Sequence, residues 1–279
     1  MLSDYHVHLR PDDEGSDAEK YFTRENAERY RELAAERGIE ELGVSEHVHR
    51  FVQALEVWTH PWYRHWAVDD LDAYCEFVRS ETDLKLGIEV DFLPGREDRI
   101  ANLLDGRDWD YVLGSVHFLS DEAIDLGEGR WAEFGIWRSG DPDDVWTRYF
   151  QALGEAARTG LYDILAHPDL VKVWGQGAPI PDGDPRRFYD LAMDGIADSD
   201  VAIEVSTAGL RKPVGEIYPA RQFLDMCMEA ECPLALSSDA HRPEQLGFEY
   251  ERAVEWLRDA GVERIAVFSR RERVLEPLG

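Results

Sequence analysis

The sequence predicts an α/β fold in which parallel strands form a barrel. Three observations support this prediction. Short apolar, β-rich runs alternate with longer stretches of helical period, the alternation continues through seven or eight units, and no repeat or low-complexity linker interrupts it. Strict alternation of strand and helix implies parallel pairing with right-handed crossovers, and this number of units is enough to close a barrel. We therefore expect one domain over residues 1–279.

The expected strands are short runs rich in Val, Ile and Leu, and most of them end in polar residues. In chain order they are DYHVH (4–8), ELGVSEH (41–47), KLGIEVDF (85–92), YVLGSVHF (111–118), DILAHP (163–168), VAIEVS (201–206) and PLALSSDAH (233–241). A further run, RIAVFS at 264–269, is a candidate for an eighth strand.

Six stretches between the strands have the apolar spacing of amphipathic helices. They run from Arg24 to Arg37, Leu71 to Glu81, Asp143 to Thr159, Pro185 to Ala197, Val214 to Glu231, and Tyr250 to Ala260. Gly38 stands where a helix should stop, and Pro213 stands where a helix should start. The Trp-rich segment 57–66 and the stretch 119–142 are expected to be long βα excursions.

The chain is strongly acidic, with 58 Asp and Glu against 30 Lys and Arg and a net charge of −28. Such a surface repels nucleic acid and anionic membrane, because phosphate binding needs clustered cations. The sequence has neither an apolar run of about 18 residues nor a signal-peptide pattern. Its three cysteines, Cys75, Cys227 and Cys232, form no paired framework, which fits a reducing compartment. We therefore expect a cytoplasmic protein with no nucleic-acid or membrane partner.

The residues at the strand ends are of the kinds that bind metal ions. His6 and His8 are two apart on the first expected strand, so their side chains share a face and can converge on one ion. The other strand ends supply His47, Glu89, His117, His167, Asp239 and His241. In a βα barrel the C-terminal strand ends meet at one mouth, where active sites lie. Because so dense a group of imidazoles and carboxylates would be unstable without cations, the sequence predicts a multinuclear metal site.

The order of these motifs resembles the polymerase-and-histidinol-phosphatase (PHP) superfamily. The order is HxH, strand-end His, GxE, SxH, AHPD and SDAH. The phrases DYHVH, GIEVDF, DYVLGSVHF, AHPDLVK, STAGLRKP and SSDAHRPEQLG resemble its histidinol-phosphatase branch, from residue 4 to about residue 248. The resemblance implies a distorted seven-stranded TIM-like βα barrel that holds three divalent metal ions. It also implies a phosphomonoesterase whose partner is a small phosphorylated metabolite, L-histidinol phosphate.

The resemblance further implies three groups of metal ligands. The first would comprise His6, His8, Glu89 and Asp239. Glu89 would bridge to a second group that comprises His117 and His167. The third would comprise His47, His241 and one residue from the loop after the first strand.

The sequence does not decide which residue of the loop after the first strand is the metal ligand. Family members usually have a His or Asp at the spacing where this chain has Glu14, and Asp12 and Asp13 lie beside it. We take Asp12 and Glu14 as the candidates, with Asp13 as a further alternative.

Closely spaced divalent ions lower the pKa of a bridging water and clamp the attacking and leaving oxygens of a phosphoryl group. The expected reaction is therefore in-line attack of a metal-bridging hydroxide on phosphorus, without a phosphoenzyme. We assign catalytic roles to Glu89, Asp239 and His241. Sites of His and carboxylate accept zinc, manganese or iron, so the sequence leaves the identity of the metal open.

Two of the few cations follow strand ends, namely Lys172 in HPDLVK and Arg211 in AGLRKP. The family pattern implies that both grip the phosphate. Ser115 and Ser206 lie near the expected mouth, where each would either orient phosphate or fill the barrel. Asp91 would either support the metal ligands or contact a cationic substrate.

Histidinol phosphate carries an ammonium group and an imidazole, so its pocket should contain acids or aromatic rings near the mouth. Besides Asp91, the sequence offers Phe118, Asp121 and Glu122 there. The histidines off the strand ends are expected to stay away from the metals, and the recurring tryptophans are expected to pack. These residues are His49, His60, His65, Trp58, Trp62 and Trp66.

Other functions are open to the same motifs. The first alternative keeps the chemistry and changes the substrate to another sugar or nucleotide phosphomonoester. A nucleic-acid-processing PHP module is disfavoured by the negative charge and by the absence of a basic groove in the sequence. A metal-binding regulator without activity is disfavoured by the complete ligand set. The sequence leaves the oligomeric state open.

Overall fold

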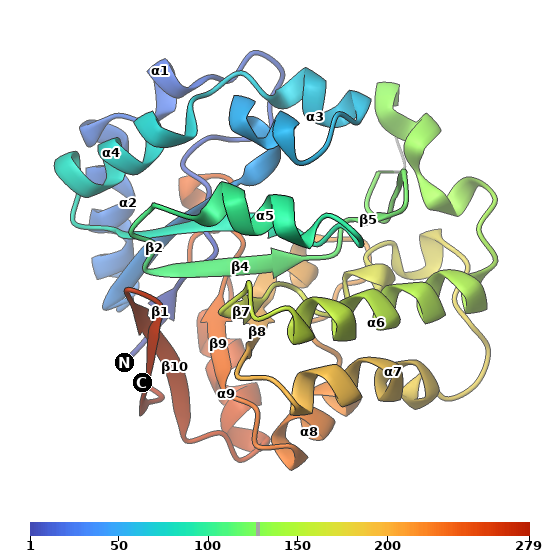
Figure 1. Cartoon of the computed structure of the whole chain (residues 1–279). Coiled ribbons are helices and arrows are strands. Elements are labelled where there is room, and N and C mark those ends of the chain that lie inside the picture. The colour runs from blue at the N-terminus through green and yellow to red at the C-terminus, as the bar shows by residue number, and fades with distance from the viewer. Residues whose placement is uncertain (127–128) are drawn as a thin grey trace.

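Seven parallel strands form a nearly closed barrel in the computed structural model, which describes residues 1–126 and 129–279 (Figure 1). The order of the strands around the barrel is β1-β2-β3-β4-β7-β8-β9. Their bounds are β1 Ser3–Asp4, β2 Glu41–His47, β3 Lys85–Asp91, β4 Tyr111–Ser115, β7 Ile164–Leu165, β8 Ala202–Ser206 and β9 Leu234–Ser237. The predicted α/β barrel is confirmed.

The barrel closes between its first and last strands. Val7 and Ala240 form an isolated parallel bridge, in which His8 N–H donates to Ala240 O (2.8 Å) and Ala240 N–H donates to His6 O (3.0 Å). The two histidines of the first motif therefore lie beside the segment that follows β9.

The register of the strands brings their C-terminal ends to one rim. His47, the last residue of β2, is the partner of Glu89 on β3, and Asp91 on β3 is the partner of Ser115, the last residue of β4. Side chains two apart on a strand share a face, so Glu89 and Asp91 lie on the same side of β3.

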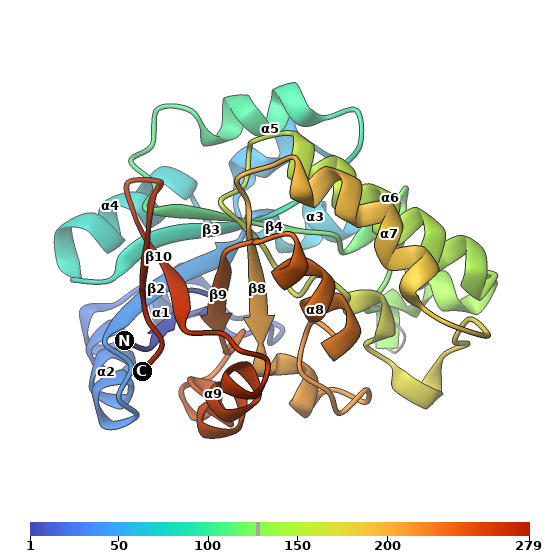
Figure 2. The same ribbon diagram turned by 90° about the horizontal axis from the view of Figure 1, so that it is seen from below.

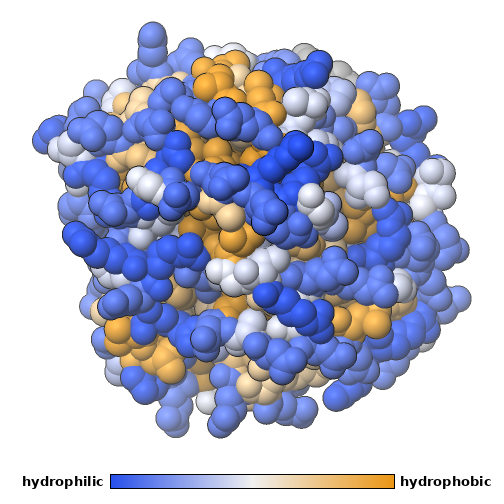
Figure 3. Space-filling model, viewed as in Figure 1, coloured by the Kyte–Doolittle hydropathy of each residue, from blue (hydrophilic) through white to orange (hydrophobic). Residues whose placement is uncertain are grey.

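Helices cover the outside of the barrel (Figures 1 and 2). They are α1 Ala18–Tyr21, α2 Arg24–Glu36, α3 Pro61–Trp66, α4 Leu71–Glu81, α5 Glu97–Leu104, α6 Pro142–Arg158, α7 Arg186–Ala197, α8 Arg221–Glu229 and α9 Tyr250–Asp259. Thr23 caps α2 by accepting from Asn26 N–H (3.2 Å), and Gly38, at φ +71°, follows its end as predicted. No helix of the described residues is long and apolar enough to cross a bilayer. Figure 3 shows a largely hydrophilic face with smaller apolar patches.

Tyrosines fill the barrel interior below the mouth. Tyr5 and Tyr111 are fully buried, and their ring centroids are 4.8 Å apart. The side chain of Tyr111 fits there because Gly43 and Gly87 have no side chain, and a Cβ on either glycine would lie 2.3 Å from an atom of the tyrosine side chain. This aromatic layer leaves the upper layer of the barrel to the ionisable residues.

Several expected strands are shorter in the structure, such as DILAHP (163–168), which is a strand only at Ile164–Leu165, and two further elements differ more. Of the run DYHVH only Asp4 is part of a strand (β1, Ser3–Asp4), and Val7 forms a single isolated bridge to Ala240 in the segment after β9. The helix expected over 214–231 begins only at Arg221, so Pro213 does not start it. Pro219 lacks an N–H and disfavours helical geometry in Tyr218, whose backbone instead pairs with Ser206 (2.8 and 3.0 Å).

The candidate eighth strand is not part of the barrel sheet. RIAVFS forms β10 (Arg264–Ser269), which pairs antiparallel with β11 (Glu272–Pro277). Buried residues of β10, including Ala266 and Phe268, pack against the tyrosine layer, so this hairpin closes the end of the barrel opposite the mouth.

The two long excursions both lie near the mouth. The first contains α3, and the second contains the short hairpin β5 (Phe118–Leu119) and β6 (Glu122–Ala123) followed by two 3₁₀ turns, 129–134 and Ile136–Arg138. Residues 127 and 128 of the second excursion lie outside the described residues. The helix α5, which the sequence pattern did not predict, lies between β3 and β4.

Candidate metal centre

The histidines and acids predicted at the strand ends lie together at the mouth of the barrel. Three overlapping groups of donor atoms occur there, and within each group the atoms lie within 4.8 Å of one another. The groups are His6, His8 and Asp239; His6, Glu89 and His167; and His8, His47 and His241. His117 is adjacent, with its Nε2 3.4 Å from Glu89 Oε1.

Glu89 lies at the centre of this cluster and is buried. Its Oε2 is 2.5 Å from His47 Nδ1 and 3.3 Å from His6 Nε2. Its Oε1 is 3.2 Å from His167 Nε2 and 3.4 Å from His117 Nε2. A single carboxylate that contacts imidazoles from separate segments has the geometry of a bridging ligand.

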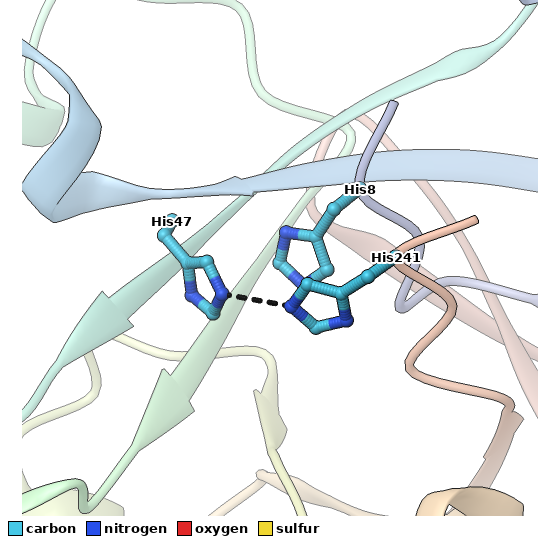
Figure 4. A group of neighbouring side chains, drawn as sticks. All are labelled: His8, His47 and His241. Carbon is cyan, nitrogen blue, oxygen red and sulfur yellow. Dashed lines mark hydrogen bonds between the residues drawn. The ribbon is translucent and has the colours of Figure 1, made fainter. Parts of the chain in front are cut away.

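Three imidazoles stack at one side of the cluster (Figure 4). The ring of His8 lies 4.1 Å from that of His47 and 4.2 Å from that of His241, centroid to centroid. His47 Nε2 and His241 Nε2 point toward each other at 3.1 Å. Two ring nitrogens at this distance need a proton or a cation between them, because two lone pairs repel each other.

The loop after β1 brings one of its three acids to this pair of histidines. Asp12 Oδ2 is 3.0 Å from His241 Nε2 and 3.8 Å from His47 Nε2. Asp13 instead pairs with Arg242 on the surface. Glu14 does not reach the cluster, since its carboxylate is exposed and lies 3.3 Å from His65. The geometry therefore favours Asp12 and does not fit Glu14.

Burial and mutual attraction set the charges of the cluster. Burial lowers the pKa of His6, but the carboxylates of Glu204, Glu89 and Asp239 outweigh it and hold that pKa well above its ordinary value. Burial and the neighbouring imidazoles hold the pKa of His8 well below its ordinary value. The cluster thus contains both cationic and neutral imidazoles among its carboxylates.

Several buried polar atoms of the cluster have no hydrogen-bond partner among the described residues. They are His6 Nε2, both ring nitrogens of His8, and His167 Nδ1. A buried polar group without a partner is costly, so such a concentration in one place calls for a ligand. Imidazole nitrogen and carboxylate oxygen are the donors that zinc, manganese and iron accept, and the residues therefore fit divalent metal ions.

Glu204 is a supporting residue that the sequence interpretation missed. It lies on β8 and is fully buried. Its Oε1 is 2.8 Å from His6 Nδ1 and accepts from Ser237 Oγ (2.6 Å), while its Oε2 accepts from His167 N–H (2.5 Å). A carboxylate behind a histidine fixes the ring and leaves the other nitrogen for a metal. The available signal was an acid inside an otherwise apolar strand, two residues before its end.

Asp91 supports the cluster in the same way, which decides between its two expected roles in favour of the first. Its Oδ1 is 2.7 Å from His117 Nδ1, and its Oδ2 accepts from Tyr63 Oη (2.5 Å). With both oxygens engaged and the carboxylate buried, Asp91 orients His117.

The two predicted phosphate-binding cations differ in position. Arg211 Nη2 donates to the backbone oxygens of Ser238 and Asp239 (2.8 Å each), and its buried Nη1 has no hydrogen-bond partner among the described residues. The ammonium group of Lys172 is instead paired with Asp169 (2.9 Å) and Glu216 (3.0 Å).

The ring of Tyr218 lies near both Lys172 and the cluster. Lys172 Nζ is 5.5 Å from the centroid of this ring, and the ring of His167 is 6.4 Å from it, centroid to centroid. Ser115 is buried at the end of β4, and its Oγ has no hydrogen-bond partner within the described part of the chain.

A cavity of about 140 Å³ opens beside the cluster. Its lining comprises Asp12, His47, His49, Trp62, Trp66, His117, Phe118, Asp125 and Leu126. The expected acids Asp121 and Glu122 are exposed and do not line it, because they lie at the turn of the β5–β6 hairpin. The acid that lines the cavity beyond Asp12 is Asp125, and Trp62, Trp66 and His49 also line it.

A βα barrel whose mouth gathers buried imidazoles and carboxylates in this way defines a metal-dependent enzyme. The chain belongs to the PHP domain family, whose sequence model matches residues 22–208. The resemblance drawn from the motifs is thereby confirmed.

Two relatives of this chain are named as histidinol-phosphatases. A Deinococcus radiodurans protein named "Probable histidinol-phosphatase" is 36% identical over 211 residues, 75% of this chain and 76% of the relative. A Bacillus subtilis "Histidinol-phosphatase" is 28% identical over 189 residues, 63% of this chain and 70% of the relative.

A solved structure shares the fold over nearly the whole chain. It is the histidinol phosphate phosphatase of Lactococcus lactis complexed with zinc, L-histidinol and phosphate. It matches with a TM-score of 0.71 and 17% identity and covers 98% of both chains.

Zinc binding to the metal-free protein is expected to release protons at neutral pH and to strengthen as the pH rises. Burial lowers the pKa of His47 and His117, but the neighbouring carboxylates together outweigh it: Glu89 and Asp12 raise the pKa of His47 to about 9, and Glu89 and Asp91 raise that of His117 to about 10. Both rings are therefore protonated at neutral pH, and an ion must displace these protons because only neutral imidazole binds metal. Calorimetric titration in buffers of different ionisation enthalpy measures the protons released, and binding without proton release near pH 7 would contradict the expectation.

Proposed function

We propose that this protein is a metal-dependent phosphomonoesterase that hydrolyses L-histidinol phosphate to L-histidinol and phosphate. The observation that carries the proposal is the convergence of the predicted imidazoles and carboxylates around Glu89 at the barrel mouth. Membership of the PHP family and the names of the relatives support the choice of substrate.

We place three divalent ions in the cluster, with zinc as the first candidate and manganese and iron as alternatives. The proposed ligands are His6, His8, Asp12, His47, Glu89, His117, His167, Asp239 and His241. When bound, such ions activate water and neutralise phosphate charge. Glu89 would connect two ions, and Glu204 and Asp91 would hold the rings of His6 and His117 in place.

Arg211 is the group that we propose for direct phosphate contact. Its Nη2 is fixed behind Asp239 by two carbonyl oxygens, which leaves the buried Nη1 free to donate to a phosphate oxygen. Lys172 would act less directly, since Asp169 and Glu216 already engage its ammonium. Water attacks phosphorus, the P–O bond to the alcohol breaks, and the alcohol leaves with a proton.

The cavity beside the cluster suits the rest of this substrate. Trp62 and Phe118 offer aromatic faces to an imidazole ring, and Asp125 offers a negative charge to an ammonium group. The overall charge of −28 disfavours nucleotides and nucleic acid.

The protein is expected to favour histidinol phosphate over nucleoside monophosphates by at least about tenfold in kcat/KM, which corresponds to roughly 1.4 kcal/mol. The physical reason is the pairing of the substrate ammonium with an acidic mouth that repels additional negative charge. Phosphate release from the zinc-loaded protein measures this ratio, with phosphoethanolamine as a control that carries an ammonium but no ring. Equal rates on histidinol phosphate and nucleoside monophosphates would contradict the proposed substrate but not the proposed phosphatase activity. Failure to hydrolyse any phosphomonoester would contradict the proposed activity itself.

A further inference from the structure

A fully buried arginine contacts the loop that carries Asp12. Arg50 ends the 3₁₀ turn Val48–Arg50, which directly follows His47, and its side chain is 0% exposed. Its Nη1 donates to Glu46 and its Nη2 donates to Asp12 Oδ1. Arg50 thus bridges a buried acid on β2 and the acid that lies against the histidine pair.

The partner of Arg50 also holds the start of the same loop. Glu46 is fully buried, and its Oε1 accepts from Leu9 N–H (2.7 Å) and Arg10 N–H (3.2 Å). The Glu46–Arg50 pair therefore fixes both the backbone that follows His8 and the side chain of Asp12.

This network contains three carboxylates but only two guanidinium groups. Arg10 pairs with Asp69, and Arg50 pairs with Glu46. Asp12 is the third carboxylate facing two guanidinium groups, and its side chain is 50% exposed. Its Oδ1 meets Arg50, and its Oδ2 faces His241 at 3.0 Å. One oxygen of Asp12 is thus engaged by Arg50, and the other faces the histidine pair, where it can bind a cation.

We propose that Arg50 is a positioning residue that holds Asp12 against the His47–His241 pair and so completes a site for a divalent cation. This inference rests on the proposed function, in which the pair holds one of the ions. Asp12 lies on a loop and half in solvent, so its carboxylate could rotate away from the histidines if one oxygen were not fixed. A guanidinium suits this role because its planar fork donates to two carboxylates at once.

The test measures zinc affinity as well as activity. The dissociation constant of the weakest-bound zinc is measured by competition with a chromophoric chelator, and zinc per chain is counted after dialysis. Arg50→Met is expected to weaken that zinc by at least about tenfold, as removal of an outer partner of a metal ligand does. Arg50→Lys keeps the charge without the fork and is expected to weaken it less. Arg242→Gln, a matched control, removes an exposed arginine that pairs with Asp13 (2.7 Å) and should change nothing.

A double mutant separates positioning from general stability. If Arg50 acts through Asp12, the Asp12→Asn/Arg50→Met protein binds the weakest zinc no less tightly than Asp12→Asn alone. Additive losses, or a folded Arg50→Met protein with wild-type zinc affinity, would overturn the proposal. If Arg50→Met does not fold by circular dichroism, Arg50→Lys decides, and loss of folding in both would assign Arg50 a structural role instead.

The outcomes separate this inference from the proposed function. If the wild-type protein does not hydrolyse histidinol phosphate but the zinc affinities change as expected, the proposed function fails and the role of Arg50 stands. If the wild-type protein is active and Asp12→Asn keeps all of its zinc, the role of Arg50 fails and the proposed function stands.

Discussion

Replacing Glu89 with glutamine is expected to lower kcat by roughly a thousandfold or more, because bound metal ions supply several kcal/mol of transition-state stabilisation and about 4 kcal/mol corresponds to that factor. Glu89 contacts His6, His47, His117 and His167 through its two oxygens. An amide keeps the shape but loses the charge and one acceptor oxygen, so two metal positions should weaken together. Zinc content after dialysis and single-turnover rates measure both effects.

The matched control is Glu244→Gln, which makes the same exchange at an exposed acid close to His241 in the sequence. It should leave zinc content and rate unchanged. A Glu89→Gln protein with full zinc content and full activity would show that Glu89 is not a metal ligand needed for catalysis. Circular dichroism of both variants shows whether the barrel is intact.

Replacing Glu204 with glutamine is expected to weaken zinc binding about ten- to a hundredfold, the usual effect of losing the partner of a ligating histidine. The carboxylate of Glu204 accepts hydrogen bonds from His6 Nδ1, Ser237 Oγ and His167 N–H. Glutamine must turn its own N–H₂ toward at least one of these donors, and each buried donor without an acceptor costs about 1–3 kcal/mol. Zinc competition and the free energy of unfolding of the metal-free protein measure the two effects.

Ser237→Ala serves as the control for this prediction, because it removes one donor to Glu204 and leaves the carboxylate in place. Its effect on zinc affinity should be much smaller than that of Glu204→Gln. Wild-type zinc affinity in the Glu204→Gln protein would show that His6 is oriented without this carboxylate.

Most of the barrel could be predicted because strand and helix differ in apolar period, and a parallel sheet follows from their alternation. The errors arose where tertiary contacts override local pattern. Residues 214–220 have a helical spacing, but Pro219 and the pairing of Tyr218 with Ser206 keep them from forming a helix. β10 has the composition of a barrel strand, and only the hairpin with β11, which could not be read from the pattern, shows that it closes the opposite end.

The donors of the metal centre could be predicted for a different reason. Strand ends converge in any βα barrel, so positions in the sequence determined which histidines and acids would meet. Long-range partners carry no such signal. Arg50 follows a polar run and Glu204 interrupts an apolar strand, and the roles of both depend on which atoms lie opposite them after folding. The same limit explains why Asp12 could not be separated from Glu14 by spacing alone.

The bridge between Val7 and Ala240 also determines when the centre can form during biosynthesis. Because translation runs from the N-terminus, a ribosome makes His6 and His8 well before Asp239 and His241. A nascent chain that has not reached β9 therefore carries these histidines without Asp239, the acid that faces them. We therefore expect metal loading to follow translation, since a product of interrupted translation keeps the HxH motif but lacks Asp239 and His241.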